Sequence, residues 1–205
     1  MLTLFYAPGS CSDASRIALE EAGADYQALR VDLRGGEQRN PDYLALNPNG
    51  RVPLLVTEDG PISETVAILG WIAQSFPDAQ LAPADPFGFA RAQSFNAYMA
   101  STVHVAYAHK FRGRRWADDP ACLAHLTSKV PQTMAASFQL IEDGLLEGPW
   151  VLGQQFSICD AYLFTLADWL EGAGVDPHSL PRVLDHRERV RARPAVQKVL
   201  AQQAA

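Results

Sequence analysis

The strongest constraint on the fold is a change in the character of the chain near residue 76. Three prolines fall within residues 77–87 of this 205-residue sequence. Proline has no backbone N–H and a fixed φ, so this stretch predicts a linker. Strand-like and helix-like patterns alternate before it, and only helix-like patterns follow it. We therefore expect a mixed α/β domain at 1–76 and an all-helical domain at 88–205.

The first domain is predicted to have the element order β-α-β-α-β-β-α. Strands are assigned where apolar residues run together or alternate, and helices where they recur at helical spacing. Asn40 and Ser63 are the expected N-caps of the second and third helices. The segments before the third helix are 2–6, 13–22, 25–33, 40–47, 52–57 and 61–63.

In the second domain, apolar residues recur at intervals of three or four and predict buried helix faces. Ser157 and Asp160 form an aspartate variant of the capping box before an apolar helix. Pro194 begins the last helix. The two predicted buried faces consist of Ala92, Phe95, Met99 and Val103, and of Val130, Met134, Phe138, Ile141 and Leu145.

Composition excludes several classes of function. A net charge of -6 argues against nucleic-acid binding, which requires basic residues gathered on one face. No apolar run is long enough for a transmembrane helix, and the N-terminus does not resemble a secretory signal, so we expect a cytoplasmic protein with no membrane partner. The three cysteines, at positions 11, 122 and 159, have no metal-ligand spacing, and we expect no metal.

Cys11 lies in "YAPGSCSDASR", at the start of the first predicted helix. The N–H groups and dipole of a helix N-terminus favour negative charge, so a thiolate is stabilised there. The same N–H groups could instead stabilise the thiolate of a bound ligand. A small cysteine that only fills the helix entrance is the alternative.

Two further segments carry weaker signals. Pro53, at the head of a strand, cannot donate to a β-ladder, so the backbone of Val52 is left to pair with another group. Glu64 and Thr65 fall in the first turn of a helix, where an acid, a hydroxyl and free N–H groups together could hold the zwitterionic head of an amino acid. Dipole compensation by Glu64 is the alternative.

Taken in order, Cys11, Val52-Pro53 and Glu64-Thr65 resemble the glutathione transferase family. "FYAPGSCS" is similar to the bacterial beta-class form, and "SICDAYLFTLADW" to the family's buried capping box. The resemblance covers essentially the whole chain. It implies a thioredoxin-like N-terminal domain followed by a helical domain, with glutathione as co-substrate.

The resemblance also implies roles for individual residues. Cys11 corresponds to the cysteine beside the glutathione sulfur, and the backbone of Val52, exposed by a cis Pro53, corresponds to the group that pairs with the cysteinyl unit. Glu64 and Thr65 correspond to the residues that hold the γ-glutamyl end. The remaining correspondences are Arg51 near the glycyl carboxylate, and His104, Ser101 and Trp169 around the sulfur.

The chain departs from the beta-class pattern at one position. His104 is followed by Val105, where a lysine is common, which removes a cation. Tyr6 corresponds to the tyrosine position of other classes, and the hydroxyls of Ser10 and Ser12 are further candidate donors. We rank Cys11 first as the catalytic residue, then Ser12, then Tyr6.

The implied activity is attack of the glutathione thiol on a hydrophobic electrophile, thiol-disulfide exchange through Cys11, or both. Such an enzyme has a detoxification role and is usually a homodimer. The aromatic side chains of Tyr107, Trp116 and Trp169 are expected near the electrophile. The alternative is a non-catalytic binding or interaction protein on the same fold.

Overall fold

The computed structural model describes residues 1–202. These fall into two compact units. The N-terminal unit comprises residues 1–93 and the C-terminal segment that begins at Arg191, and the helical unit comprises Ser94–Val190. The domain boundaries expected from the sequence, with a linker at 77–87, stay a prediction.

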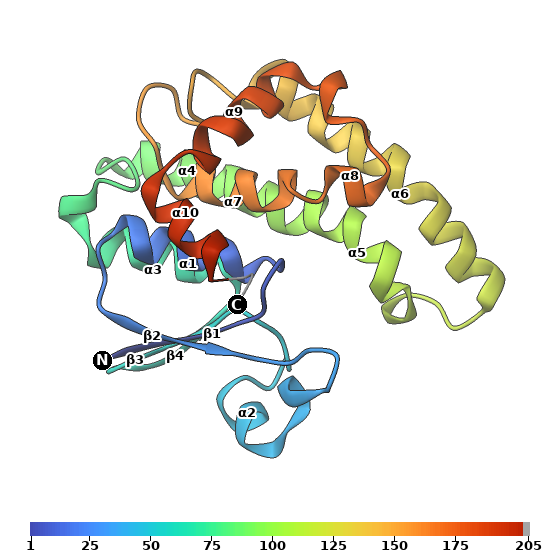
Figure 1. Ribbon diagram of the computed structural model, residues 1–205, viewed down its shortest axis with the longest axis horizontal. Coiled ribbons are helices and arrows are strands. Elements are labelled where there is room, and N and C mark those ends of the chain that lie inside the picture. The colour runs from blue at the N-terminus through green and yellow to red at the C-terminus, as the bar shows by residue number, and fades with distance from the viewer. Residues whose placement is uncertain (203–205) are drawn as a thin grey trace. The chain divides into compact units, whose positions relative to one another are not determined.

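A four-stranded mixed sheet forms the centre of the N-terminal unit, with the strand order β2-β1-β3-β4. β1 runs parallel to β2 and antiparallel to β3, and β3 runs antiparallel to β4. Helices α1 and α3 lie together on one side of the sheet, and α2 lies on the other (Figure 1). The order β-α-β-α-β-β-α expected from the sequence is confirmed. The strands are β1 Leu2–Tyr6, β2 Tyr26–Arg30, β3 Leu54–Thr57 and β4 Gly60–Ser63.

The helices of this unit start where proline or turn residues precede an apolar face. α10, at the C-terminal end, lies against α1 (Figure 1). Its predicted start at Pro194 is confirmed. The helices are α1 Ser12–Glu21, α2 Pro41–Leu46, α3 Thr65–Ser75 and α10 Pro194–Ala201, with short 3₁₀ turns at Glu37–Arg39 and Pro77–Ala79.

The start of α3 differs from the prediction. Ser63 does not cap this helix, because it belongs to β4 and pairs with Leu54 of β3. The N-cap position falls on Glu64, whose φ is 71°. A positive φ is uncommon for a residue other than glycine, so the chain adopts a strained conformation where the sheet passes into the helix.

The helical unit buries the predicted apolar faces with one exception. Leu145 is 40% exposed, whereas Leu146 is 2% exposed. A π-helical turn at Ile141–Leu145 replaces the expected α-helical end. A π-turn contains one extra residue, so the side chains beyond it rotate to a different face and Leu146 takes the buried place.

One π-turn ends α6, and another, at Met99–Val103, joins α4 to α5. α5 and α6 lie side by side. The boundary between the units falls within α4 Pro86–Tyr98, after Gln93. The other helices are α5 His104–Arg112, α6 Pro120–Leu140, α7 Ile158–Ala167, α8 Leu170–Ala173 and α9 Pro181–Arg191, with short 3₁₀ turns at Gly113–Arg115 and Pro177–Ser179.

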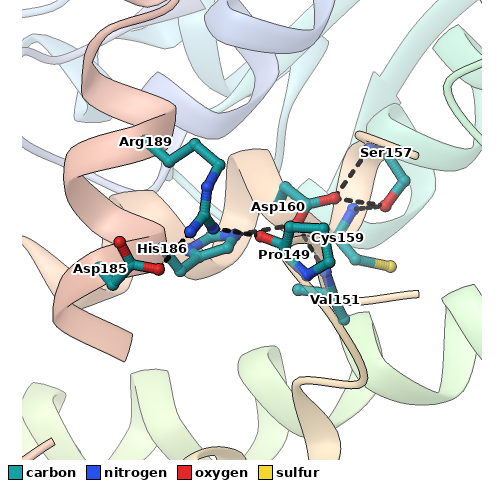
Figure 2. Close-up of polar contacts among 8 residues, drawn as sticks. All are labelled: Pro149, Val151, Ser157, Cys159, Asp160, Asp185, His186 and Arg189. Atoms are coloured by element: carbon teal, nitrogen blue, oxygen red, sulfur yellow. Dashed lines mark hydrogen bonds and ion pairs between the residues drawn. The ribbon is translucent and has the colours of Figure 1, made fainter. Parts of the chain in front are cut away.

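The predicted capping box of α7 is present. The Ser157 side chain accepts a backbone hydrogen bond from the first turn, and Asp160 accepts one from the N-cap backbone. Asp160 is fully buried and also accepts hydrogen bonds from the Val151 amide and from His186 of α9 (Figure 2). One carboxylate therefore joins the start of α7 to two other segments of this unit.

Candidate active site

Cys11 occupies the N-cap position of α1 and is 8% exposed. Its thiol points to the Val52 backbone carbonyl, with Sγ 3.5 Å from the oxygen. The thiol also has a hydrogen bond with the Thr65 side chain. The structure thus brings together Cys11, Val52 and Thr65 from three separate segments of the N-terminal unit.

Of the possibilities left open for Cys11, burial disfavours a Cys11 thiolate in the free protein. Burial raises the pKa of the Cys11 thiol to about 11, against a lowering by the Thr65 hydrogen bond. The negative charges of Asp13 and Glu64 raise this pKa further. Amides of the first turn are also already engaged, because Ser12 N bonds to Ser10 Oγ and Asp13 N to Ser10 O. Desolvation therefore outweighs the helix dipole, and at neutral pH Cys11 is a neutral thiol.

Alkylation of Cys11 by iodoacetamide should therefore increase steeply only at alkaline pH, with a midpoint near pH 11. Because the folded protein holds this proton more tightly than the unfolded chain, the midpoint in denaturant should fall to about 8.5. The measurement is rapid alkylation across pH with peptide mapping, and exposed Cys122 serves as the internal reference. A plateau already reached near neutral pH would contradict the buried neutral thiol.

Ser12 and Tyr6 hold the structure around Cys11. The Ser12 side chain is fully buried, and its hydroxyl donates to Ala7 O at 3.1 Å and accepts from Ala7 N at 3.0 Å. The Tyr6 ring is 8% exposed and lies under Arg16, whose guanidinium carbon is 4.0 Å from the ring centroid. Both side chains have structural contacts that support the turn between β1 and α1, so their catalytic roles stay weaker predictions than that of Cys11.

The segment before β3 fixes the backbone of Val52. The Val52-Pro53 peptide bond is cis, as the resemblance implied. The carbonyl of the preceding Arg51 accepts hydrogen bonds from the Tyr43 hydroxyl at 2.7 Å and from Asn47 Nδ2 at 2.8 Å. Both Val52 and Pro53 are buried, whereas Arg51 is exposed. The Arg51 side chain is therefore accessible to a solute, while its backbone is anchored.

Glu64 and Thr65 lie where β4 passes into α3. Thr65 is buried and faces Cys11, and Glu64 is exposed with a positive φ of 71°. The Asn49 side-chain amide donates to the Glu64 carboxylate at 3.5 Å. Strained residues of this kind cluster at ligand sites, because the surrounding structure must hold them in place. Sequence reasoning missed Asn49, and no local signal in the sequence points to it.

The helical unit groups three of the residues predicted in it. The rings of His104 and Trp169 meet edge to face with centroids 5.2 Å apart, and Tyr107 stacks on Trp169 at 4.8 Å. Exposed Ser101 lies in the π-turn that precedes His104. π-turns inside helices are frequent at functional sites, and no pattern in the sequence predicted this one. Trp116, which was expected beside the same ligand, packs against His109 at 4.3 Å.

The N-terminal unit therefore offers an exposed carboxylate, a buried hydroxyl, a neutral thiol and an anchored backbone strand end, which together suit a small zwitterionic peptide with a sulfur group. The helical unit offers an aromatic surface suited to an apolar ligand. Within residues 1–202, no group of three or more histidine, cysteine or acidic side chains is placed to hold a metal ion. No helix in that range is both long and apolar enough to cross a membrane.

Comparisons with known proteins agree over the whole length. The family model for the glutathione S-transferase N-terminal domain matches residues 1–74, and that for the C-terminal domain matches residues 117–203. Glutathione S-transferase GstA of Escherichia coli O157:H7 is 34% identical over 98% of each chain. Maleylacetoacetate isomerase of Pseudomonas aeruginosa is 33% identical over 93% of this chain and 91% of that protein.

Among solved structures, a glutathione transferase homologue from Sulfitobacter with bound glutathione is 46% identical. It covers 98% of both chains with a TM-score of 0.95. The expected fold, a thioredoxin-like domain followed by a helical domain, is confirmed. This chain belongs to the glutathione S-transferase family.

Proposed function

We propose that this chain is a glutathione transferase that binds reduced glutathione in residues 1–76 and directs its sulfur at a hydrophobic electrophile held by residues 88–205. The observation that carries the proposal is the contact of the Cys11 thiol with the Val52 carbonyl, at 3.5 Å, together with its interaction with the Thr65 side chain. Full-length similarity to a named transferase and to a structure with bound glutathione supports an enzyme over a non-catalytic binding protein.

In this proposal each binding residue contacts a different part of glutathione. The Glu64 carboxylate pairs with the ammonium of the γ-glutamyl end, while the Thr65 hydroxyl bonds its carboxylate. The Val52 backbone pairs with the cysteinyl unit, and Arg51 approaches the glycyl carboxylate. Ser101, His104 and Trp169 contribute from the helical unit, with the stacked Tyr107 extending the apolar surface.

Conjugation is the chemistry that the neutral Cys11 supports best. The glutathione thiol gives its proton to solvent, the resulting thiolate forms a bond to an electrophilic carbon, and the leaving group departs with its electron pair. A neutral Cys11 S–H can donate a hydrogen bond to that thiolate and so lower the pKa of glutathione. In thiol transfer, by contrast, Cys11 itself must ionise, attack a disulfide and release the other sulfur as a thiolate.

Replacing Cys11 by alanine should separate the two chemistries. We expect conjugation of a chloronitrobenzene to glutathione to fall about tenfold, because one hydrogen bond to a charged group is lost. Reduction of a glutathione mixed disulfide should vanish. Intact mass spectrometry after incubation of the unmodified protein with oxidised glutathione provides the second measurement, and thiol transfer requires one glutathione mapped to Cys11.

The matched control is Cys122→Ala, since Cys122 is an exposed thiol far along the chain from Cys11. This control should leave both activities unchanged. Full disulfide reduction by Cys11→Ala would rule out the thiol-transfer role. Failure of the unmodified protein to bind glutathione by calorimetry would favour the non-catalytic alternative.

We also propose a cytoplasmic homodimer with a detoxification role. Phe87 is a candidate contact residue for self-association because it is 76% exposed, whereas Phe95 of the same helix is buried in the core. Light scattering coupled to size exclusion tests the dimer directly. A monomer of about the chain mass, 22.4 kDa, at micromolar concentration would contradict it.

A further inference from the structure

A buried ion pair lies behind the loop that carries Cys11. Asp13 and Arg16 stand one turn apart on α1, with a carboxylate oxygen of Asp13 4.0 Å from Arg16 Nη1. Arg16 is fully buried and Asp13 is 6% exposed. A buried guanidinium requires a counter-charge, and a separation of three residues on a helix suits this pairing.

Arg16 is held from several directions. Tyr6 of β1 lies beneath its guanidinium, the hydroxyl of Tyr26 of β2 interacts with it, and Gln202 after α10 accepts from Nη2. The Tyr26 hydroxyl also donates to Glu20 at 3.0 Å. These contacts come from the sheet, from α1 and from the C-terminal segment, so they restrict the Arg16 guanidinium to one position in the packed interior.

Asp13 connects this buried cluster to the loop between β1 and α1. Its second carboxylate oxygen accepts a hydrogen bond from the Gly9 amide at 2.8 Å. Gly9 has a φ of 71°, a conformation that glycine adopts without strain. Ser12 anchors the same loop at Ala7. The loop is therefore tied to α1 just before Cys11.

We infer that Asp13 and Arg16 form a positioning pair for Cys11, in which Arg16 orients Asp13, Asp13 holds the loop at Gly9, and the loop sets the thiol against Val52 and Thr65. This inference rests on the proposed role of Cys11 at the glutathione site. Neither residue contacts the sulfur-binding groups in the manner of a catalytic residue, so both act through the loop.

The carboxylate of Asp13 also contributes to the negative charge near Cys11. Asp13 and Glu64 are the negative groups that disfavour its thiolate, and Thr65 favours it. Arg16 offsets the charge of Asp13. Removing the carboxylate charge should therefore ease ionisation of Cys11, and removing the guanidinium should hinder it.

The test measures iodoacetamide alkylation of Cys11 by peptide mapping across pH in Asp13→Asn, Arg16→Met and Arg16→Lys. At about pH 9, we expect Asp13→Asn to react about threefold faster and Arg16→Met about threefold slower than the unmodified protein, because each shifts the midpoint by about half a pH unit. Arg16→Lys restores the cation and should recover most of the Arg16→Met change.

Opposite shifts distinguish positioning from simple structural support. Variants that only loosened the structure would both expose Cys11 and would both move its midpoint down. Such parallel shifts, or unchanged midpoints in folded variants, overturn the inference. If Arg16→Met does not fold, Asp13→Ala decides, because it removes both the charge and the acceptor of the Gly9 amide, whereas Asp13→Asn removes only the charge. Equal alkylation profiles for Asp13→Ala and Asp13→Asn would overturn the positioning role.

Lys198→Ala is the matched control. It removes the pair between Lys198 and Glu20, which also joins α10 to α1 but does not touch Asp13. Its alkylation profile should match that of the unmodified protein. Alkylation of Cys11 needs neither glutathione nor an electrophile, so failure of this test and failure of the proposed transferase activity are separate results.

Discussion

Replacing Glu64 by glutamine should weaken glutathione binding about 30- to 100-fold, or about 2–3 kcal/mol. The proposed partner of this carboxylate is the ammonium of the γ-glutamyl end. Glutamine keeps the size of the side chain and one acceptor oxygen but loses the charge. Once the ligand covers the site and excludes water, an ammonium left without its counter-charge is costly. Isothermal titration calorimetry with reduced glutathione provides the measurement.

The geometry of Glu64 supports an effect of this size. The residue holds a φ of 71°, and Asn49 donates to its carboxylate at 3.5 Å. A strained backbone costs on the order of 1–3 kcal/mol, so the fold maintains this conformation against a local preference for others. The carboxylate is thus oriented before the ligand arrives, which reduces the entropy lost on binding.

Glu58→Gln is the matched control for this prediction. Glu58 lies in the exposed turn between β3 and β4, in the same unit, and the substitution removes the same charge. Its dissociation constant for glutathione should equal that of the unmodified protein, apart from a small long-range effect that salt screens. If Glu64→Gln and Glu58→Gln bind equally well, Glu64 does not hold the ammonium.

The sequence was enough to predict those features that depend on local patterns. β1 was predicted at its observed bounds because its apolar run is short and followed by turn residues. The capping box at Ser157 and Asp160 was predicted because it is defined by a spacing of three residues. In such cases the physical cause lies within a few residues of its effect.

Features that depend on contacts between distant segments could not be predicted from local sequence patterns. Burial against segments that begin at Val52 and Thr65 raises the pKa of Cys11, and the local pattern around the start of α1 does not reveal that burial. The place of Leu145 depends on a π-turn that helical spacing does not predict. The pairing of Asp13 with a buried Arg16 requires the sheet and the C-terminal segment to enclose the guanidinium.

The site residues were found by their joint order rather than by any one of them. Cys11, Val52 and Thr65 are each ordinary in their local context, yet the fold brings all three together. A resemblance to a family indicates from the sequence which distant residues lie close together in the fold. It did not supply the hydrogen bond between Asn49 and Glu64, which only the folded structure shows.

The largest expected effect on stability comes from Asp160→Ala. Asp160 is fully buried and accepts from Ser157 N at 2.8 Å, from the Ser157 hydroxyl at 2.9 Å and from Val151 N at 2.7 Å. It also lies 2.8 Å from His186 Nε2 (Figure 2). Alanine would leave these buried groups without their acceptor. We expect the free energy of unfolding in urea to fall by about 3–5 kcal/mol.

Asp119→Ala separates the capping function from this wider network. Asp119 is the N-cap of α6 and accepts from the amides of Ala121 and Cys122, but it is exposed. Water can replace its hydrogen bonds, so its removal should cost much less than that of Asp160. Equal losses would mean that Asp160 acts only as a cap. A loss confined to Asp160→Ala would instead locate the stability of the helical unit in the link that this carboxylate makes between α7, the Val151 segment and α9.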